Sequence, residues 1–205
     1  MRALLTAPLA LVWTAAFGIP AALSGAVDRS GHLPWRIARA WGRVLLRTWG
    51  VRVQVNGAEQ VPAGPAVYAA NHASALDIPI LFGHLPAEFR VIHKRSLYWA
   101  PVVGQYLFLG GHIGVQRGRA AAARRSLARA AARIRAGTSV AVFPEGTRSG
   151  DPRVQPFKRG SFVLAIRAGV PVVPVSISGV KALAPRGMLL LTPGTVTMTL
   201  HAPQP

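Results

Sequence analysis

The chain of 205 residues carries 24 lysine and arginine residues against 6 acidic residues, and this formal net charge of +18 indicates a polyanionic partner, either nucleic acid or an anionic membrane. Its length and its hydrophobic content of 51% predict a single domain with a sizeable core. Because the sequence contains no cysteine, disulfides, thiolate nucleophiles and cysteine-based zinc sites are excluded.

Residues 3–27 carry no charged side chain, and this run exceeds the ~20 residues that a helix needs to cross a bilayer. Pro8 and Pro20 leave two alternatives, a kinked spanning helix and a re-entrant segment, and both attach the chain to a membrane. A signal peptide would have a shorter apolar core and a more basic start. A basic cluster predicts that the rest of the chain lies on the cytoplasmic face: Arg29, Arg36, Arg39, Arg43 and Arg47.

Residues 33–49 place three tryptophans among arginines at helical spacing, and Gly50 ends the run. Such a helix is typical of the membrane interface, where its cations contact anionic headgroups. The alternative is a helix that simply packs on the domain. We therefore expect membrane-associated helices in residues 1–50 and an α/β domain in residues 51–205.

From Val51 onward, short apolar strands alternate with helices. The predicted strands are residues 51–55, 66–70, 89–93, 113–115, 139–143, 170–176 and 195–200. Helices are predicted near residue 78, over 119–136 and over 160–168. The arginines of the helix over 119–136 are interpreted as a solvated face. This order predicts an α/β fold with a mixed, largely parallel central sheet flanked by helices.

The stretch Asn71-His-Ala-Ser-Ala-Leu-Asp77 follows a predicted strand and precedes a helix start. Residues five apart in a helix point roughly 140° away from each other, so His72 and Asp77 meet only if the chain bends between them. A carboxylate bound to one ring nitrogen fixes the tautomer of a histidine and leaves the other nitrogen free to accept a proton. The stretch predicts a general base with its orienting acid, and the alternative is a structural hydrogen bond or helix cap.

A second polar turn, Phe143-Pro-Glu-Gly-Thr-Arg-Ser149, follows the strand predicted over 139–143. It gathers a carboxylate, a guanidinium, two hydroxyls and a glycine. Open α/β sheets bind ligands at the carboxyl ends of their strands, so we expect the two loops to meet at one edge of the sheet. The alternative is that the glycine and the hydroxyl residues serve only the turn.

Together these two stretches resemble the glycerolipid acyltransferase family, whose best-known members are the 1-acylglycerol-3-phosphate acyltransferases. Weaker blocks agree in order and spacing: Lys94-Arg-Ser-Leu97 with Pro101 and Gly104, Gly111-His-Ile-Gly-Val-Gln-Arg117, and Val170-Pro-Val-Val-Pro-Val175. The resemblance covers about residues 50–180.

The resemblance implies transfer of an acyl group from a thioester to a glycerol hydroxyl. His72 would take the proton of the hydroxyl, and Asp77 would hold the imidazole. Negative charge on the thioester oxygen would be met by backbone N–H groups near the Glu145-Gly146 turn or by His72. No acyl-enzyme is implied.

The same resemblance implies substrate-binding residues. Arg148 is the first expected ligand of a phosphate on the acceptor, followed by Arg117 and Lys94. Glu145 would bind an acceptor hydroxyl or orient Arg148. The remaining residues expected to contact substrate are Asn71, Gly146 and Thr147.

We therefore expect a membrane-bound enzyme that uses acyl-CoA or acyl carrier protein to convert 1-acylglycerol 3-phosphate to phosphatidic acid. Glycerol 3-phosphate, another lysophospholipid or a lyso-aminolipid are alternative acceptors. No cofactor is expected, and no metal, because the other histidines lack ligand spacing. The alternative from another class is a basic, membrane-tethered nucleic-acid-binding protein, which the clustering of aromatic residues near the N-terminus disfavours.

Overall fold

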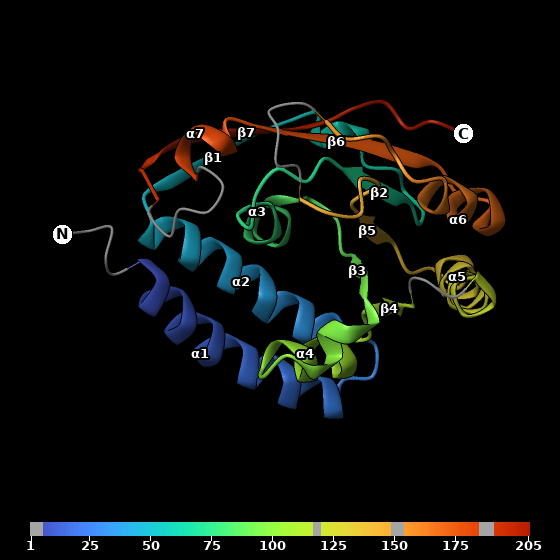
Figure 1. Ribbon diagram of the computed structural model, residues 1–205, viewed down its shortest axis with the longest axis horizontal. Helices are drawn as coiled ribbons and strands as arrows, with labels where there is room; N and C mark the ends of the chain where they lie inside the picture. Colours follow the sequence, from blue (N-terminus) through green and yellow to red (C-terminus); the bar gives the residue numbers. More distant parts are fainter. Residues whose placement is uncertain (1–5, 117–119, 149–153, 185–190) are drawn as a thin grey trace.

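The computed structural model describes residues 6–116, 120–148, 154–184 and 191–205. A seven-stranded sheet in the order β1-β7-β6-β2-β5-β3-β4 forms its centre (Figure 1). The strands are β1 (Val51–Asn56), β2 (Val67–Ala70), β3 (Arg90–Lys94), β4 (Ile113–Val115), β5 (Val140–Val142), β6 (Val172–Ser178) and β7 (Gly194–Leu200). Only β6 and β7 pair antiparallel among neighbours. The predicted mixed, largely parallel sheet is confirmed.

Helices cover both faces of the sheet (Figure 1). They are α1 (Thr6–Val27), α2 (His32–Thr48), α3 (Asp77–His84), α4 (Val103–Leu109), α5 (Ala120–Arg135), α6 (Gly160–Ala168) and α7 (Val180–Leu183), with 3-10 helices η2 (Ala58–Gln60) and η3 (Arg95–Trp99). Tyr68 packs in the core on the side of α1 to α4, whereas Val67 packs in the core with α5 and α6. This alternation follows the two-residue period of a strand, and burial of both faces explains the apolar runs.

Helix α2 lies between α1 and α3 (Figure 1). Its buried side includes Leu45 and Leu46, and Arg39 and Arg43 donate hydrogen bonds to the carbonyls of Leu85 and Gly83 at 2.6 and 2.9 Å. These two arginines therefore satisfy carbonyl groups at the end of α3. Helix α2 thus packs on the domain, while its Arg36 and Arg47 are exposed. Its position at the membrane interface stays a prediction.

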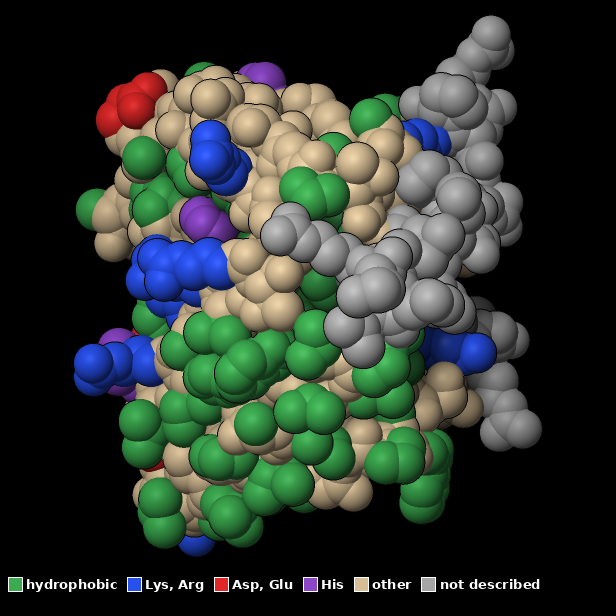
Figure 2. Space-filling view, turned by 90° about the vertical axis from the view of Figure 1, so that its left-hand side faces the viewer, with side chains coloured by type: hydrophobic (Ala, Val, Ile, Leu, Met, Phe, Trp, Pro, Cys, Tyr) green, Lys and Arg blue, Asp and Glu red, His purple; other side chains and the backbone are tan. Residues whose placement is uncertain are grey.

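Helix α1 presents an apolar face to the outside. Its Leu11, Leu23 and Val27 are 74%, 67% and 81% exposed, while its other side packs on α2 and α4. Figure 2 shows hydrophobic side chains gathered over the lower part of one face of the molecule, where α1 lies. Within the described residues, Ala7–Val27 is long and apolar enough to cross a membrane, judged by length and composition alone.

Candidate active site

The two polar loops predicted from the sequence meet at one edge of the sheet. Strands β2 and β5 are parallel neighbours, so the loops that follow them start side by side. The backbone N–H of His72, after β2, donates to Oε1 of Glu145, after β5, at 2.6 Å. The hydrogen bond joins residues that are far apart in the sequence, as the strand-end argument predicts.

His72 and Asp77 form the predicted pair. His72 Nδ1 lies 2.9 Å from Oδ2 of Asp77, a residue with no exposed surface at the first position of α3. The same oxygen accepts the backbone N–H groups of Ala73 and Ser74, each at 2.8 Å. These bonds hold the carboxylate in place and require a proton on Nδ1, so that Nε2 is the nitrogen left to accept a proton.

The His72 ring is also fixed from its flat side. It stacks on Phe143 with ring centroids 4.0 Å apart and an angle of 18° between the planes. Only 16% of its side chain is exposed. The imidazole is thus preorganised by a carboxylate at its edge and an aromatic ring on its face.

Glu145 and Asn71 make hydrogen bonds that were not predicted from the sequence. Glu145 is 3% exposed, and its two oxygens accept the backbone N–H groups of His72 and Gln155 at 2.6 and 2.9 Å. The Asn71 amide donates to the carbonyl of Ile177 at 3.0 Å and accepts its N–H at 2.7 Å. Both polar groups are therefore bonded to the backbone of neighbouring segments. Contact of Glu145 and Asn71 with substrate stays a prediction.

A cavity of about 1290 Å³ lies in front of His72. Its lining includes His72, Lys94, Gly146, Thr147 and Arg148, which lie at or just after the carboxyl ends of strands β2, β3 and β5. The rest is lined mainly by apolar side chains of α1, α2, α3 and α4, among them Leu11, Phe17, Trp41, Phe82 and Leu107. The volume and the mixed cationic and apolar lining suit an amphiphile with a charged head and a long apolar tail.

Three cationic side chains lie at or near this cavity, and two of them, Lys94 and Arg148, were expected from the sequence. Lys94 and Arg148 line the cavity and are exposed, as a phosphate ligand requires. Lys158 was not singled out in the sequence, but it covers Gly146 so closely that an added Cβ would lie 2.6 Å from its Nζ. Arg117 lies outside the described residues.

Two backbone N–H groups in this region, those of Gly146 and His72, are engaged in hydrogen bonds within the loops. The N–H of Gly146 donates to the carbonyl of Phe143 at 2.9 Å, in a turn that gives Gly146 a positive φ of 75°. The N–H of His72 donates to Glu145. Which donors would face the thioester oxygen stays a prediction, with the remaining N–H groups of the turn and the His72 ring as its candidates.

His93 is a cavity residue that sequence reasoning passed over. It is 5% exposed, and its Nδ1 lies 3.0 Å from the carbonyl of Lys94. Burial lowers its pKa, and the bond to Lys94 opposes that shift. The ring is therefore neutral at pH 7. Within the described residues, no group of three or more histidine, aspartate or glutamate side chains could hold a metal ion.

The fold and site define an α/β protein in which a histidine held by a buried carboxylate lines a large, mainly apolar cavity. Residues 52–178 match the family model described as Acyltransferase, and the chain belongs to this family. The resemblance of the sequence blocks to acyltransferases is thereby confirmed.

Curated relatives of the chain are named 1-acyl-sn-glycerol-3-phosphate acyltransferases. One from Chlamydomonas reinhardtii is 40% identical over 157 residues, 75% of this chain and 47% of the relative. The human alpha form is 39% identical over 132 residues, 63% of this chain and 47% of the relative. The chain thus spans about half the length of these relatives.

A solved structure agrees over nearly the whole chain. The crystal structure of the 1-acyl-sn-glycerophosphate (LPA) acyltransferase PlsC from Thermotoga maritima is similar with a TM-score of 0.79 and 29% identity. The match covers 99% of this chain and 87% of that chain. The likeness includes the N-terminal helices as well as the sheet.

Proposed function

We propose that this protein transfers a fatty acyl group from acyl-CoA or acyl carrier protein to the free hydroxyl of 1-acylglycerol 3-phosphate, giving phosphatidic acid. One observation carries the proposal: a histidine whose Nδ1 is bound to a buried carboxylate lines a large cavity that also has cationic and many apolar lining residues. The names of the relatives and of the structural neighbour support this choice of reaction.

In the proposed reaction, His72 Nε2 removes the proton of the acceptor hydroxyl as its oxygen attacks the thioester carbon. The tetrahedral intermediate then breaks its C–S bond, and the thiolate takes the proton from the imidazolium. The buried carboxylate of Asp77 stabilises the imidazolium between these two steps. An ester replaces the thioester, and no covalent enzyme intermediate forms.

In this proposal, the cations that line the cavity bind the acceptor phosphate. Arg148 and Lys94 both line the cavity, and Arg148 can bind a phosphate through two parallel hydrogen bonds. Lys158, above Gly146, adds a third positive charge close by. The acyl chain would then extend between the helices, where apolar side chains replace water.

Membrane association belongs to the same proposal. The exposed leucines of α1 and the 89% exposed Trp99 are the surfaces proposed to enter the bilayer. Because the other side of α1 packs on α2 and α4, we favour a helix that lies in one leaflet over one that spans the bilayer alone. We propose residues 1–50 as the membrane-binding part and the cytoplasmic face as its location.

The decisive experiment follows acyl transfer by the full chain from labelled acyl-CoA and from acyl carrier protein to a panel of lysolipids. His72→Ala should lower turnover ~10²-fold or more, the loss expected for a general base. His201→Ala is the matched control, because His201 is exposed and the hydrogen bond described for its ring is the one with the Ser176 hydroxyl, away from the catalytic cavity. Near-normal turnover of His72→Ala would refute the proposed mechanism.

A further inference from the structure

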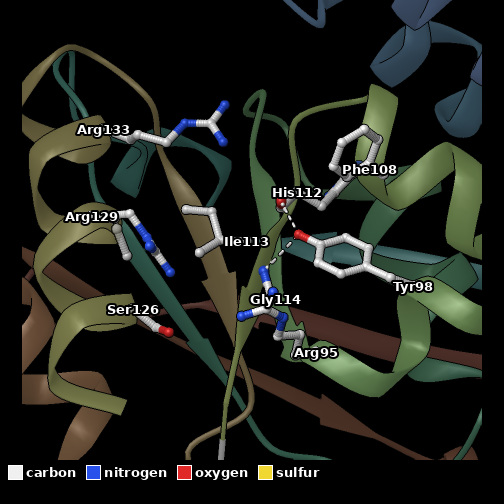
Figure 3. Close-up of a pocket in the computed structure, with 10 residues that line it drawn as sticks. Arg95, Tyr98, Phe108, His112, Ile113, Gly114, Ser126, Arg129 and Arg133 are labelled. Carbon is white, nitrogen blue, oxygen red and sulfur yellow. Dashed lines mark hydrogen bonds between the residues drawn. The ribbon is translucent and has the colours of Figure 1, made fainter. Parts of the chain in front are cut away.

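A second cavity, of about 330 Å³, lies between α5 and the segment that follows β3. Figure 3 shows Arg129 and Arg133 reaching into it from α5, with Arg95 on the opposite wall. We call this space the arginine pocket. It shares no lining residue with the catalytic cavity.

The walls of the arginine pocket are firmly held. The Tyr98 hydroxyl donates to the carbonyl of His112 and accepts the N–H of Gly114, each at 3.0 Å (Figure 3). Ser126 is buried, and its hydroxyl donates to the carbonyl of Ala122 at 2.9 Å. The polar groups of the walls are thus satisfied internally, which leaves the arginines as the groups available to a ligand.

The three guanidinium groups have no acidic partner in the part of the chain that the structure describes. No ion pair there involves Arg95, Arg129 or Arg133, and no acidic residue is among the residues that line the pocket. On α5, Ser126, Arg129 and Arg133 recur at three and four residues and therefore share one face. The interpretation of this helix face as merely solvated does not explain why Arg95 faces it from another element.

Like charges that share a concave site repel one another, and a bound anion relieves this repulsion. A phosphate group suits the site best, because it carries up to two negative charges and its oxygens match the forks of several guanidinium groups at once. A single carboxylate would neutralise only one of the three arginines.

We propose that the arginine pocket binds a phosphate group of an organic phosphate. Two sources share this chemistry. A phospholipid headgroup is suggested by Phe108, which lines the pocket, is 68% exposed and belongs to the helix that packs against α1. The phosphates of coenzyme A are suggested by η3, which places Arg95 in this pocket while the preceding Lys94 lines the catalytic cavity. The phosphate site itself does not rest on the proposed catalytic function.

The test measures binding by calorimetry to the full chain in uncharged detergent micelles. The probes are dihexanoyl phosphatidylglycerol, coenzyme A and inorganic phosphate, with dihexanoyl phosphatidylcholine as the zwitterionic comparison. The pocket variant is Arg129→Gln with Arg133→Gln. The control variant is Arg124→Gln with Arg125→Gln, which removes the same charge from exposed positions of the same helix outside the pocket.

We expect the pocket variant to bind its preferred phosphate probe about tenfold more weakly or worse, since it loses charge-assisted hydrogen bonds, whereas the control variant binds nearly as the parent does. The probe with the largest loss identifies the source of the phosphate. Equal weakening in both double variants, or no binding of any phosphate probe, would overturn the proposal. His72→Ala should keep this binding while losing turnover, so failure of the phosphate site and failure of the catalytic proposal give different results.

Discussion

The carboxylate of Glu145 joins the two loops of the site through hydrogen bonds to their backbone. Its oxygens accept N–H groups from His72 and from Gln155, and 3% of the residue is exposed. A buried acceptor that loses its partner costs about 1–3 kcal/mol, so this geometry is firmly specified. Glu145 is therefore a positioning residue for the imidazole.

Glu145→Gln should lower kcat more than it raises KM. The new amide NH₂ would face a backbone N–H, and donor against donor would push the His72 backbone away from its position. Activity across a substrate titration and the thermal unfolding midpoint check this prediction. Glu59→Gln, an exposed site with the same charge change, is the control. Loss of substrate affinity alone would restore the substrate-binding role.

His112 gives the protein a predictable sensitivity to acid. Its Nδ1 accepts the N–H of Val91 at 2.8 Å, which requires the neutral ring. Burial, with Arg90, His93 and Arg133 nearby, holds its pKa well below the ordinary value of 6.5. Below pH 6.5 the unfolded chain therefore binds a proton that the folded chain does not, and stability falls as the pH falls.

The expected slope from His112 is up to about 1.4 kcal/mol per pH unit below its ordinary pKa. His112→Asn should flatten the dependence, because an asparagine oxygen can still accept the Val91 N–H but does not titrate. Unfolding free energies measured between about pH 7.5 and 5.5 test this. His84 and His93, whose pKa values burial also lowers, leave a residual slope. Identical slopes for parent and variant would contradict the prediction.

At the scale of elements, α2 and α3 pack closely against each other at Gly42 of α2. A Cβ added at Gly42 of α2 would lie 2.6 Å from the carbonyl oxygen of Pro79 and 2.8 Å from the N of Gly83, both in α3. These neighbours are backbone atoms, which cannot swing away as a side chain can. The close packing of α2 on α3, the helix that begins with Asp77, therefore requires a residue without a side chain at position 42.

Gly42→Ala should destabilise the protein by about 1–3 kcal/mol, the usual cost of overpacking. Gly160→Ala, also in a helix but with no atom within 4 Å of the added Cβ, should be neutral or stabilise by up to ~1 kcal/mol. Thermal unfolding of both variants provides the measurement. A Gly42→Ala protein as stable as the parent would show that the two helices can separate without cost.

The elements themselves were largely predictable. All seven strands were predicted within about two residues of their observed bounds, because strands buried on both faces leave apolar runs in the sequence. The segment of η3 and α4 was not predicted as helical. These elements are short, and Pro101 separates them. Helix α4 is supported by α1, because the backbone of Leu109 in α4 packs closely against Gly25 in α1. Such support comes from residues far away in the sequence, so the segment itself need not show the helical spacing of apolar residues on which the prediction relies.

At the scale of the whole molecule, the exposed side of α1 should decide membrane affinity. Leu11→Asp and Leu23→Asp should each weaken partition into vesicles about tenfold or more, the equivalent of one leucine burial. Ile166→Asp is the matched control: Ile166 is 76% exposed, as Leu11 is at 74%, but it lies on α6, across the sheet (Figure 1). Vesicle flotation gives the readout, and equal weakening by all three variants would argue against α1 as the docking face.

The sequence by itself determined the apolar N-terminal helix, the order of the sheet-forming segments and the pairing of His72 with Asp77, because each depends on short-range spacing. The tertiary structure alone decided that Glu145 and Asn71 bond to backbone, since their partners lie 73 and 106 residues away. It also decided the catalytic cavity and the arginine pocket. Both cavities are spaces between helices and strands. Their volume depends on the angles and distances at which these elements pack, and the spacing of residues along the sequence does not specify those angles and distances.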